Sequence, residues 1–260
     1  DIETSIGKHR ILDFTDFEQA GEYAIEYGGI KTPYFRIGEQ IWENSQWKVL
    51  NFIFCQRCGY NVPGIHSTCH TDLYSEHNGT RIPYSGGWHD AGDLSQQTLQ
   101  TADVTFALLE SYRKALQSNP VLASRLKEEA RWGLEFVMKN RYSDGYRASS
   151  MGLLHWLDGV VGSKDDIKTV RIQNLPFDNF LYSGYEAYAA LTLKEEDRKT
   201  YDRLVTIAEE DYSFAMEKYL KDGYAGFRQP YEHQYNTSQS QFMATASWAS
   251  SQLYLLTGNQ

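Results

Sequence analysis

Apolar residues recur at three- and four-residue steps over most of the chain, which is the spacing of one face of an α-helix. In the clearest case, this face is formed by Leu99, Ala102, Phe106, Leu109, Tyr112 and Leu116. Similar spacing predicts five further helices, at about residues 40–57, 122–137, 179–194, 200–221 and 238–257. The segment from Asn140 to Asn179 lacks such a pattern and is expected to form a long loop. The sequence therefore predicts a mainly α-helical fold.

A helix boundary is predicted at Ser118-Asn119-Pro120. Asn is a favoured N-cap residue, because its side chain accepts a hydrogen bond from the first helical turn. Pro is favoured at the first helical position, where its missing N–H costs nothing. One helix should therefore end near Ser118 and the next should begin at Pro120.

The first forty residues have a different pattern. Tyr23, Ile25 and Tyr27 alternate with smaller or charged residues, and Gly28-Gly29 follows as a hairpin turn before Ile30. This alternation predicts two short strands. Because two strands are not stable alone in water, the segment is expected to be the end of a preceding β-domain.

Composition excludes several classes of protein. The 260 residues are 41% hydrophobic and 23% charged, which is typical of a globular protein with a substantial core. A net charge of −9 disfavours nucleic acid or an anionic membrane surface as a partner, since both require a basic face. No apolar stretch approaches the eighteen or more residues of a membrane span. The 19 Tyr and 6 Trp could pack in the core or bind sugar rings.

The stretch Gly86-Gly87-Trp88-His89-Asp90-Ala91-Gly92-Asp93, here called the acidic block, places two carboxylates three positions apart among glycines. Two acids held close together can orient a water molecule and accept its proton. Trp88, beside the acids, suits a sugar ring. An acidic turn or a calcium loop is the alternative, although calcium loops supply more oxygen ligands. Asp90 and Asp93 are therefore candidate catalytic residues, and calcium is a possible ion.

Two cysteines and two histidines lie within thirteen residues: Cys58, His66, Cys69 and His70. Two thiolates and two imidazoles complete a tetrahedral zinc site with no open position, which indicates a structural metal. Free thiols, a disulfide, or a redox pair of Cys55 with Cys58 are the alternatives. Because three cysteines leave one unpaired, Cys55, on the apolar run before the loop, is expected to be a buried free thiol.

The acidic block resembles the signature of family 9 glycoside hydrolases, the inverting cellulases and their relatives, and His89 fits one branch. The segments 56–59 and 66–71 resemble the zinc-bearing loop of the subgroup that has an immunoglobulin-like domain before the catalytic domain. The resemblance covers about residues 10–260. It implies that residues 1–38 are the last strands and linker of an immunoglobulin-like sandwich. Residues 39–260 would be the N-terminal half of an α/α toroid, a ring of twelve helices in six hairpins.

The same resemblance implies roles for individual residues. Asp93 would be the general base that activates the hydrolytic water, and Asp90 would help to hold that water. Trp88 and His89 would contact the substrate, a β-1,4-linked glucan. The general acid is a Glu near the end of the family's catalytic domain, so it is expected beyond this chain, in the remainder of that domain. Glu186, Glu217 and Glu232 are expected to be solvated. Because family members with this zinc loop are commonly secreted or held at the cell envelope, the resemblance implies a secreted, cell-envelope or periplasmic location for this protein.

The long predicted loop contains a further candidate. His155 and Trp156 could form a platform for a sugar ring, although Trp156 could equally anchor the loop onto the helices. Two other functions fit parts of the sequence. One is a carbohydrate-binding remnant that does not cleave, and the other is a zinc-stabilised interaction module.

Overall fold

The computed structural model describes residues 1–90, 94–155, 167–224 and 238–258, with only the backbone described at 153–155. The chain divides into two compact units, Asp1–Val49 and Leu50–Gln260. Helix α1 (Glu43–Cys55) contains the boundary between them. In the described residues, no helix is both long enough and apolar enough to cross a membrane.

The first unit contains short antiparallel strand pairs. They are β1 (Ile2–Thr4) with β2 (Gly7–His9), β3 (Gly21–Tyr23) with β6 (Phe35–Ile37), and β4 (Glu26–Tyr27) with β5 (Ile30–Lys31). Gly28 and Gly29 both have positive φ, 58° and 81°, as a tight two-residue hairpin turn requires. The hairpin predicted at this position is confirmed.

The second unit is built from helices. Five follow α1: α2 (Thr98–Ser118), α3 (Pro120–Lys139), α4 (Pro176–Leu193), α5 (Arg198–Asp222) and α6 (Gln239–Thr257). These are the predicted helices, with ends shifted by a few residues. Asn119 caps α3 as expected, since its Oδ1 accepts a hydrogen bond from Leu122 N at 3.0 Å.

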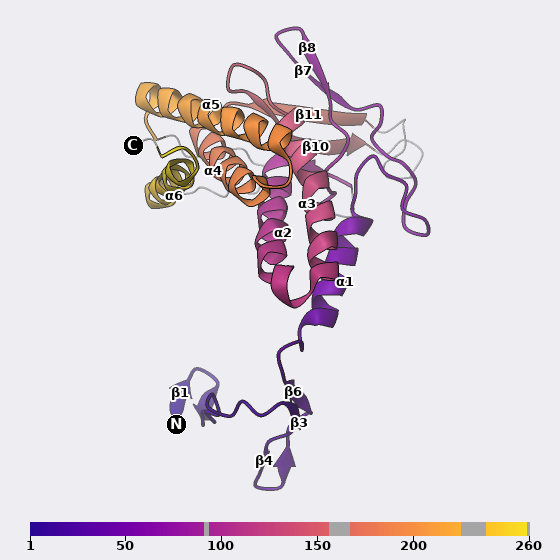
Figure 1. Cartoon of the computed structure of the whole chain (residues 1–260), viewed down its shortest axis with the longest axis vertical. Helices are drawn as coiled ribbons and strands as arrows, with labels where there is room; N and C mark the ends of the chain where they lie inside the picture. The colour runs from indigo at the N-terminus through magenta and orange to yellow at the C-terminus, as the bar shows by residue number, and fades with distance from the viewer. Residues whose placement is uncertain (91–93, 156–166, 225–237, 259–260) are drawn as a thin grey trace. The chain divides into compact units, whose positions relative to one another are not determined.

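The helices pack as consecutive hairpins. Helix α2 packs along α3 and α4 packs along α5, while α4 also contacts α2 and α6. Figure 1 shows α2 and α3 side by side, with α4, α5 and α6 grouped together. This series of adjacent hairpins is the arrangement of a partial α/α toroid, as predicted.

The prediction of a long loop between Asn140 and Asn179 was wrong. β10 (Arg147–His155) and β11 (Ile167–Gln173) pair antiparallel, and β10 also pairs with β9 (Gln96–Gln97). A second hairpin is formed by β7 (Tyr74–His77) and β8 (Thr80–Pro83). The β10–β11 ladder has register shifts and no clean alternation of burial, so its sequence lacks the usual strand signal.

A buried ion network joins this sheet to the helices. Arg147 pairs with Glu186 of α4 at 2.5 Å and with Asp211 of α5, which also pairs with Arg141 at 2.8 Å. The Arg147 guanidinium lies over the ring of Tyr182, 3.9 Å from its centroid. Glu186 is 1% exposed, so the expectation that it is a solvated helix charge was wrong. Glu217 is exposed, as expected, and Glu232 lies outside the described residues.

Candidate metal centre and acidic block

Backbone hydrogen bonds join residues 56–58 to residues 87–89 and bring the candidate residues together. Cys58 N donates to Gly87 O at 2.9 Å, and His89 N donates to Gln56 O at 2.9 Å. Between these bonds, Arg57 and Trp88 form a bridge. The loop after α1 is therefore held directly against the start of the acidic block.

An ion pair between Arg57 and Glu129 of α3 stabilises this pairing. Arg57 donates to both carboxylate oxygens of Glu129, at 3.1 and 2.7 Å, and Trp88 Nε1 donates to the same carboxylate at 2.7 Å. The guanidinium also lies 4.6 Å from the ring centroid of Trp132, whose Nε1 donates to Gly87 O at 2.8 Å. A charged pair that is bidentate and further hydrogen-bonded can be buried without leaving donors or acceptors unpaired. No motif in the sequence marks Glu129 for this position.

The pairing creates a compact group of four potential metal ligands: Cys58, Cys69, His70 and His89. One donor atom from each lies within 4.8 Å of all the others. Cys58 Sγ is 3.3 Å from His70 Nδ1, and Cys69 Sγ is 3.3 Å from His89 Nε2. All four side chains are buried. We call these residues the Cys2His2 group.

The donor spacing fits zinc. With Zn–S near 2.3 Å and Zn–N near 2.0 Å, a sulfur and a nitrogen ligand of a tetrahedral site lie roughly 3.5 Å apart. The two observed S···N distances of 3.3 Å are close to this value. Four protein donors leave no position for water, which is the coordination of a structural site.

The electrostatics of the two thiols also suit a metal. A hydrogen bond from Cys58, together with bonds from His70 and His89, lowers the pKa of the Cys69 thiol. The hydrogen bond to Cys69 and burial raise the pKa of the Cys58 thiol. A bound cation would favour the thiolate form of both sulfurs, because a coordinating thiol is deprotonated.

The ligand set differs from the predicted one at a single residue. His66 was expected to be a ligand, but its Nδ1 lies 2.8 Å from Ser67 O and its Nε2 lies 3.1 Å from Cys55 O. Both ring nitrogens thus face carbonyl oxygens, and the ring lies against His89 with centroids 5.3 Å apart. His89, expected to contact the substrate, is the fourth member of the Cys2His2 group. It lies outside residues 58–70, so the spacing of Cys and His in that segment does not reveal it.

Asp90 directly follows His89, the last member of the Cys2His2 group in the sequence. Its backbone N donates to Ser95 O at 2.9 Å, and Ser95 Oγ donates to Asp90 Oδ1 at 2.6 Å. These bonds join Asp90 to Ser95 through both the backbone and the side chain. Asp90 is exposed and lines a cavity of about 510 Å³. The other lining residues are Phe52, Gln56, Trp88, His89, Leu94, Gln100, Thr101 and Val104.

The remaining predicted site residues have different outcomes. Trp88, predicted to contact the substrate, is 6% exposed and packs where Gly133 of α3 leaves room for its ring, but it also lines the cavity beside Asp90, so its role at the substrate stays a prediction. His155 ends β10, opposite Ile167, and only its backbone is described. Trp156 and Asp93 lie outside the described residues, so their roles, and a calcium site involving Asp93, stay predictions.

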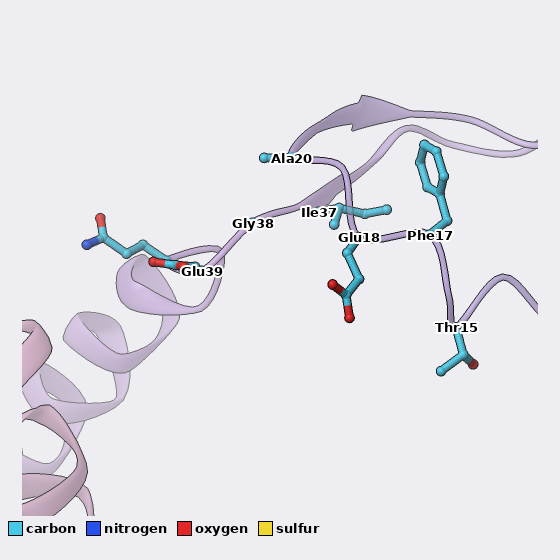
Figure 2. Close-up of a pocket in the computed structure, with 8 residues that line it drawn as sticks. Thr15, Phe17, Glu18, Ala20, Ile37, Gly38 and Glu39 are labelled. Atoms are coloured by element: carbon cyan, nitrogen blue, oxygen red, sulfur yellow. The ribbon is translucent and has the colours of Figure 1, made fainter.

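The first unit has a hollow of its own, of about 810 Å³, between residues 15–20 and 37–40. Figure 2 shows its two acidic residues, Glu18 and Glu39, extending in different directions from separate segments. Because their carboxylates do not converge, this hollow is not a candidate site.

Fold and site together define a class: a toroidal helical-hairpin domain with an acidic block beside a buried Cys2His2 group. The family model "Glycosyl hydrolase family 9" matches residues 42–260. The chain belongs to this family. No curated protein matches its sequence.

Solved structures share the fold. A thermostable endoglucanase (D468A) from Alicyclobacillus acidocaldarius has a TM-score of 0.74 at 19% identity, over 99% of this chain and 54% of that one. AaCel9A in complex with cellobiose-like isofagomine has a TM-score of 0.73 at 19% identity, over 99% of this chain and 54% of that one. A Zn-binding triple mutant of the family 9 endoglucanase J30 has a TM-score of 0.69 at 19% identity, over 95% of this chain and 51% of that one. The chain therefore spans about half the length of these structures.

Proposed function

We propose that this chain carries the water-activating side of an inverting hydrolase of β-1,4-linked glucans. The observation that carries the proposal is the exposed Asp90 carboxylate, held by Ser95 at an open cavity of about 510 Å³. Pockets of about 300–1,000 Å³ are typical of small-molecule sites. Membership of family 9 and the titles of the endoglucanase structures support glycan hydrolysis as the reaction class.

In the proposed mechanism, the carboxylate of Asp90 orients a water molecule and Asp93 accepts its proton. The water oxygen forms a bond to the anomeric carbon while the glycosidic C–O bond breaks. A carboxylic acid on the opposite side of the sugar protonates the departing oxygen, at a carboxyl separation of roughly 6.5–9.5 Å. Since the water attacks opposite the leaving group, the product has inverted configuration.

The general acid is proposed to be a Glu in the remainder of the catalytic domain, beyond Gln260. The buried glutamates of the described residues do not suit this role. Glu129 is paired with Arg57, and Glu186 is paired with Arg147. A carboxyl enclosed by arginine and helices cannot reach a polysaccharide. In this proposal, hydrolysis therefore requires the remainder of the catalytic domain as a partner of this chain.

Substitution of the two aspartates tests the proposal in the full-length enzyme. Asp93→Asn keeps the shape of the side chain but cannot accept a proton, so turnover of soluble β-glucan should fall by roughly 10²–10⁴-fold. Asp90→Asn should also lower turnover. Asp202→Asn, an exposed change on α5, is the matched control and should not alter it. Retained turnover in Asp93→Asn would refute the assignment, and unchanged affinity for cello-oligosaccharides would confirm that the fold persists.

We also propose that the Cys2His2 group holds a structural zinc ion. Its chemistry would be to cross-link the loop after α1 to the acidic block without contacting substrate. The test is metal analysis of the purified protein, followed by replacement with Co²⁺, whose visible absorption reports tetrahedral thiolate ligation. One metal per chain and strong tetrahedral bands are expected. Metal-free protein with unchanged thermal stability would end the proposal.

For the first unit, residues 1–38 are proposed to be the last strands of an immunoglobulin-like domain. The three antiparallel strand pairs support a β-domain, and their exposed apolar residues, including Ile6 and Ile30, suggest that further strands cover them. A polypeptide extended at its N-terminus should give a circular dichroism spectrum with a larger β-strand contribution than that of residues 1–260. Location outside the cytoplasm stays a prediction.

A further inference from the structure

A single peptide bond links His89, a member of the Cys2His2 group, to Asp90, the first acid of the acidic block. A restraint on His89 therefore also restrains the backbone from which the Asp90 carboxylate extends.

His89 is restrained on several sides. Its backbone N donates to Gln56 O, its Nε2 lies 3.3 Å from Cys69 Sγ, and its ring meets those of His66 and His70 edge-on. Its other ring nitrogen, Nδ1, is buried and has no hydrogen-bond partner among the described residues. Metal-bound histidines usually donate this second nitrogen to an acceptor. With a metal bound, ligation through Nε2 would therefore be the main polar restraint on the ring.

Asp90 is restrained mainly from its other end. Ser95 holds both its backbone N and its Oδ1. Two attachments, one at Ser95 and one through the His89 peptide, are needed to define both the position and the direction of a carboxylate. If His89 turns freely, the contacts with Ser95 alone must hold the direction of the Asp90 carboxylate.

We propose that His89 is a positioning residue which, as a metal ligand, sets the direction of the Asp90 carboxylate. Metal occupancy then controls the geometry at Asp90 as well as the stability of the fold. This inference depends on the proposed function only for its effect on catalysis, since the change in the loop itself can be measured without substrate.

The first experiment is hydrogen–deuterium exchange on the full-length protein, purified with zinc and after chelation at a temperature where the helices remain folded. The amide of Asp90, which is bonded to Ser95 O, should exchange at least ten-fold faster after chelation. The amide of Asn119, bonded to Ala115 O, is a control distant from the Cys2His2 group and should not change. Faster exchange in residues 58–70 with an unchanged Asp90 amide would overturn the proposal.

Two variants distinguish the effect of losing the metal from the effect of losing a ring that packs against His89. His70→Ala removes a ligand that is remote in sequence from Asp90, so it should release zinc and accelerate exchange at Asp90. His66→Ala removes a ring that touches His89 without joining the group, so it should retain zinc and leave the Asp90 amide protected. Equal exchange in the two variants would contradict a role for ligation.

Kinetics give the second readout. Chelated enzyme should lose at least ten-fold in kcat with KM within two-fold of the zinc form, and added zinc should restore kcat. A structural defect spread over the cleft would raise KM instead and would overturn the inference. If Asp93→Asn retains turnover while the exchange result holds, the proposed function fails and the coupling of His89 to Asp90 stands.

Discussion

Arg57 and Glu129 are 72 positions apart in sequence, yet they form a buried bidentate ion pair whose oxygens also accept the indole N–H of Trp88. This pair attaches α3 to both segments that build the candidate site. Its side chains are 8% and 4% exposed, so neither charge is screened by water. The position of the acidic block therefore depends on a helix that contributes no residue to the Cys2His2 group.

Glu129→Gln should be strongly destabilising. The amide keeps the shape but leaves the Arg57 charge buried without a counter-charge, which costs about 3–5 kcal/mol of unfolding free energy. Urea unfolding followed by circular dichroism measures the change. The control is Glu128→Gln, which breaks an exposed pair with Arg125 and should cost less than about 1 kcal/mol. Similar losses in both variants would show that the buried pair is unimportant.

Gly133→Ala tests the packing of Trp88. An added Cβ would lie 2.3 Å from the indole and 2.3 Å from Thr105 Oγ1, and both groups are held by hydrogen bonds of their own. Overpacking costs about 1–3 kcal/mol, occasionally more, and should exceed the roughly 1 kcal/mol of added helix propensity. Thermal unfolding measures the balance. Gly152→Ala, with no atom within 4 Å of its Cβ, is the tolerated comparison; a stabilised Gly133→Ala would be the contrary result.

Stability should depend on pH through Glu186. Burial and the neighbouring Asp211 raise the pKa of Glu186 to about 8, from an ordinary value of 4.5. The folded state then binds more protons than the unfolded state between these values, so stability should fall as pH rises from about 4.5 to about 8. Asp211 contributes with the opposite sign: burial opposes ionisation, but Arg147 and Arg141 lower its pKa, so its contribution is lost in acid.

Glu186→Gln should therefore flatten the decline between pH 5 and pH 8, because an amide does not titrate. Unfolding free energies measured at several pH values provide the comparison. Glu217→Gln, an exposed change on α5, should leave the decline as it is. An unaltered pH profile in Glu186→Gln would mean that another group causes the decline.

Cys69→Ser should release the metal, whereas Cys55→Ser should not. Cys69 belongs to the Cys2His2 group, while Cys55 lies outside it at the end of α1. Loss of a thiolate ligand removes binding energy that contributes to folding, so the midpoint of thermal unfolding should drop by several degrees. Metal content and thermal unfolding of the two variants check this. Equal metal loss in both would contradict the proposed ligand set.

The sequence predicted much of the fold and only part of the site. The helices, the Asn119 cap and the Gly28-Gly29 turn were all identified, as were three of the four members of the Cys2His2 group. Ser95 and Glu129 were missed, because an isolated serine after an acidic motif and a glutamate in a charged helix carry no distinguishing pattern. The β10–β11 ladder was missed because its register shifts disrupt the alternation that marks a strand.

What the sequence alone determined is local: helix spacing, caps and turns depend on residues within about four positions of one another. The tertiary structure decided which distant segments meet. It placed His89 rather than His66 in the Cys2His2 group, because the bridge between Arg57 and Trp88 brings residue 89 beside Cys69. It also enclosed Trp88 and Glu186, whose burial depends on helices packed around them. Such contacts join residues tens of positions apart, and their geometry exists only once the chain has folded.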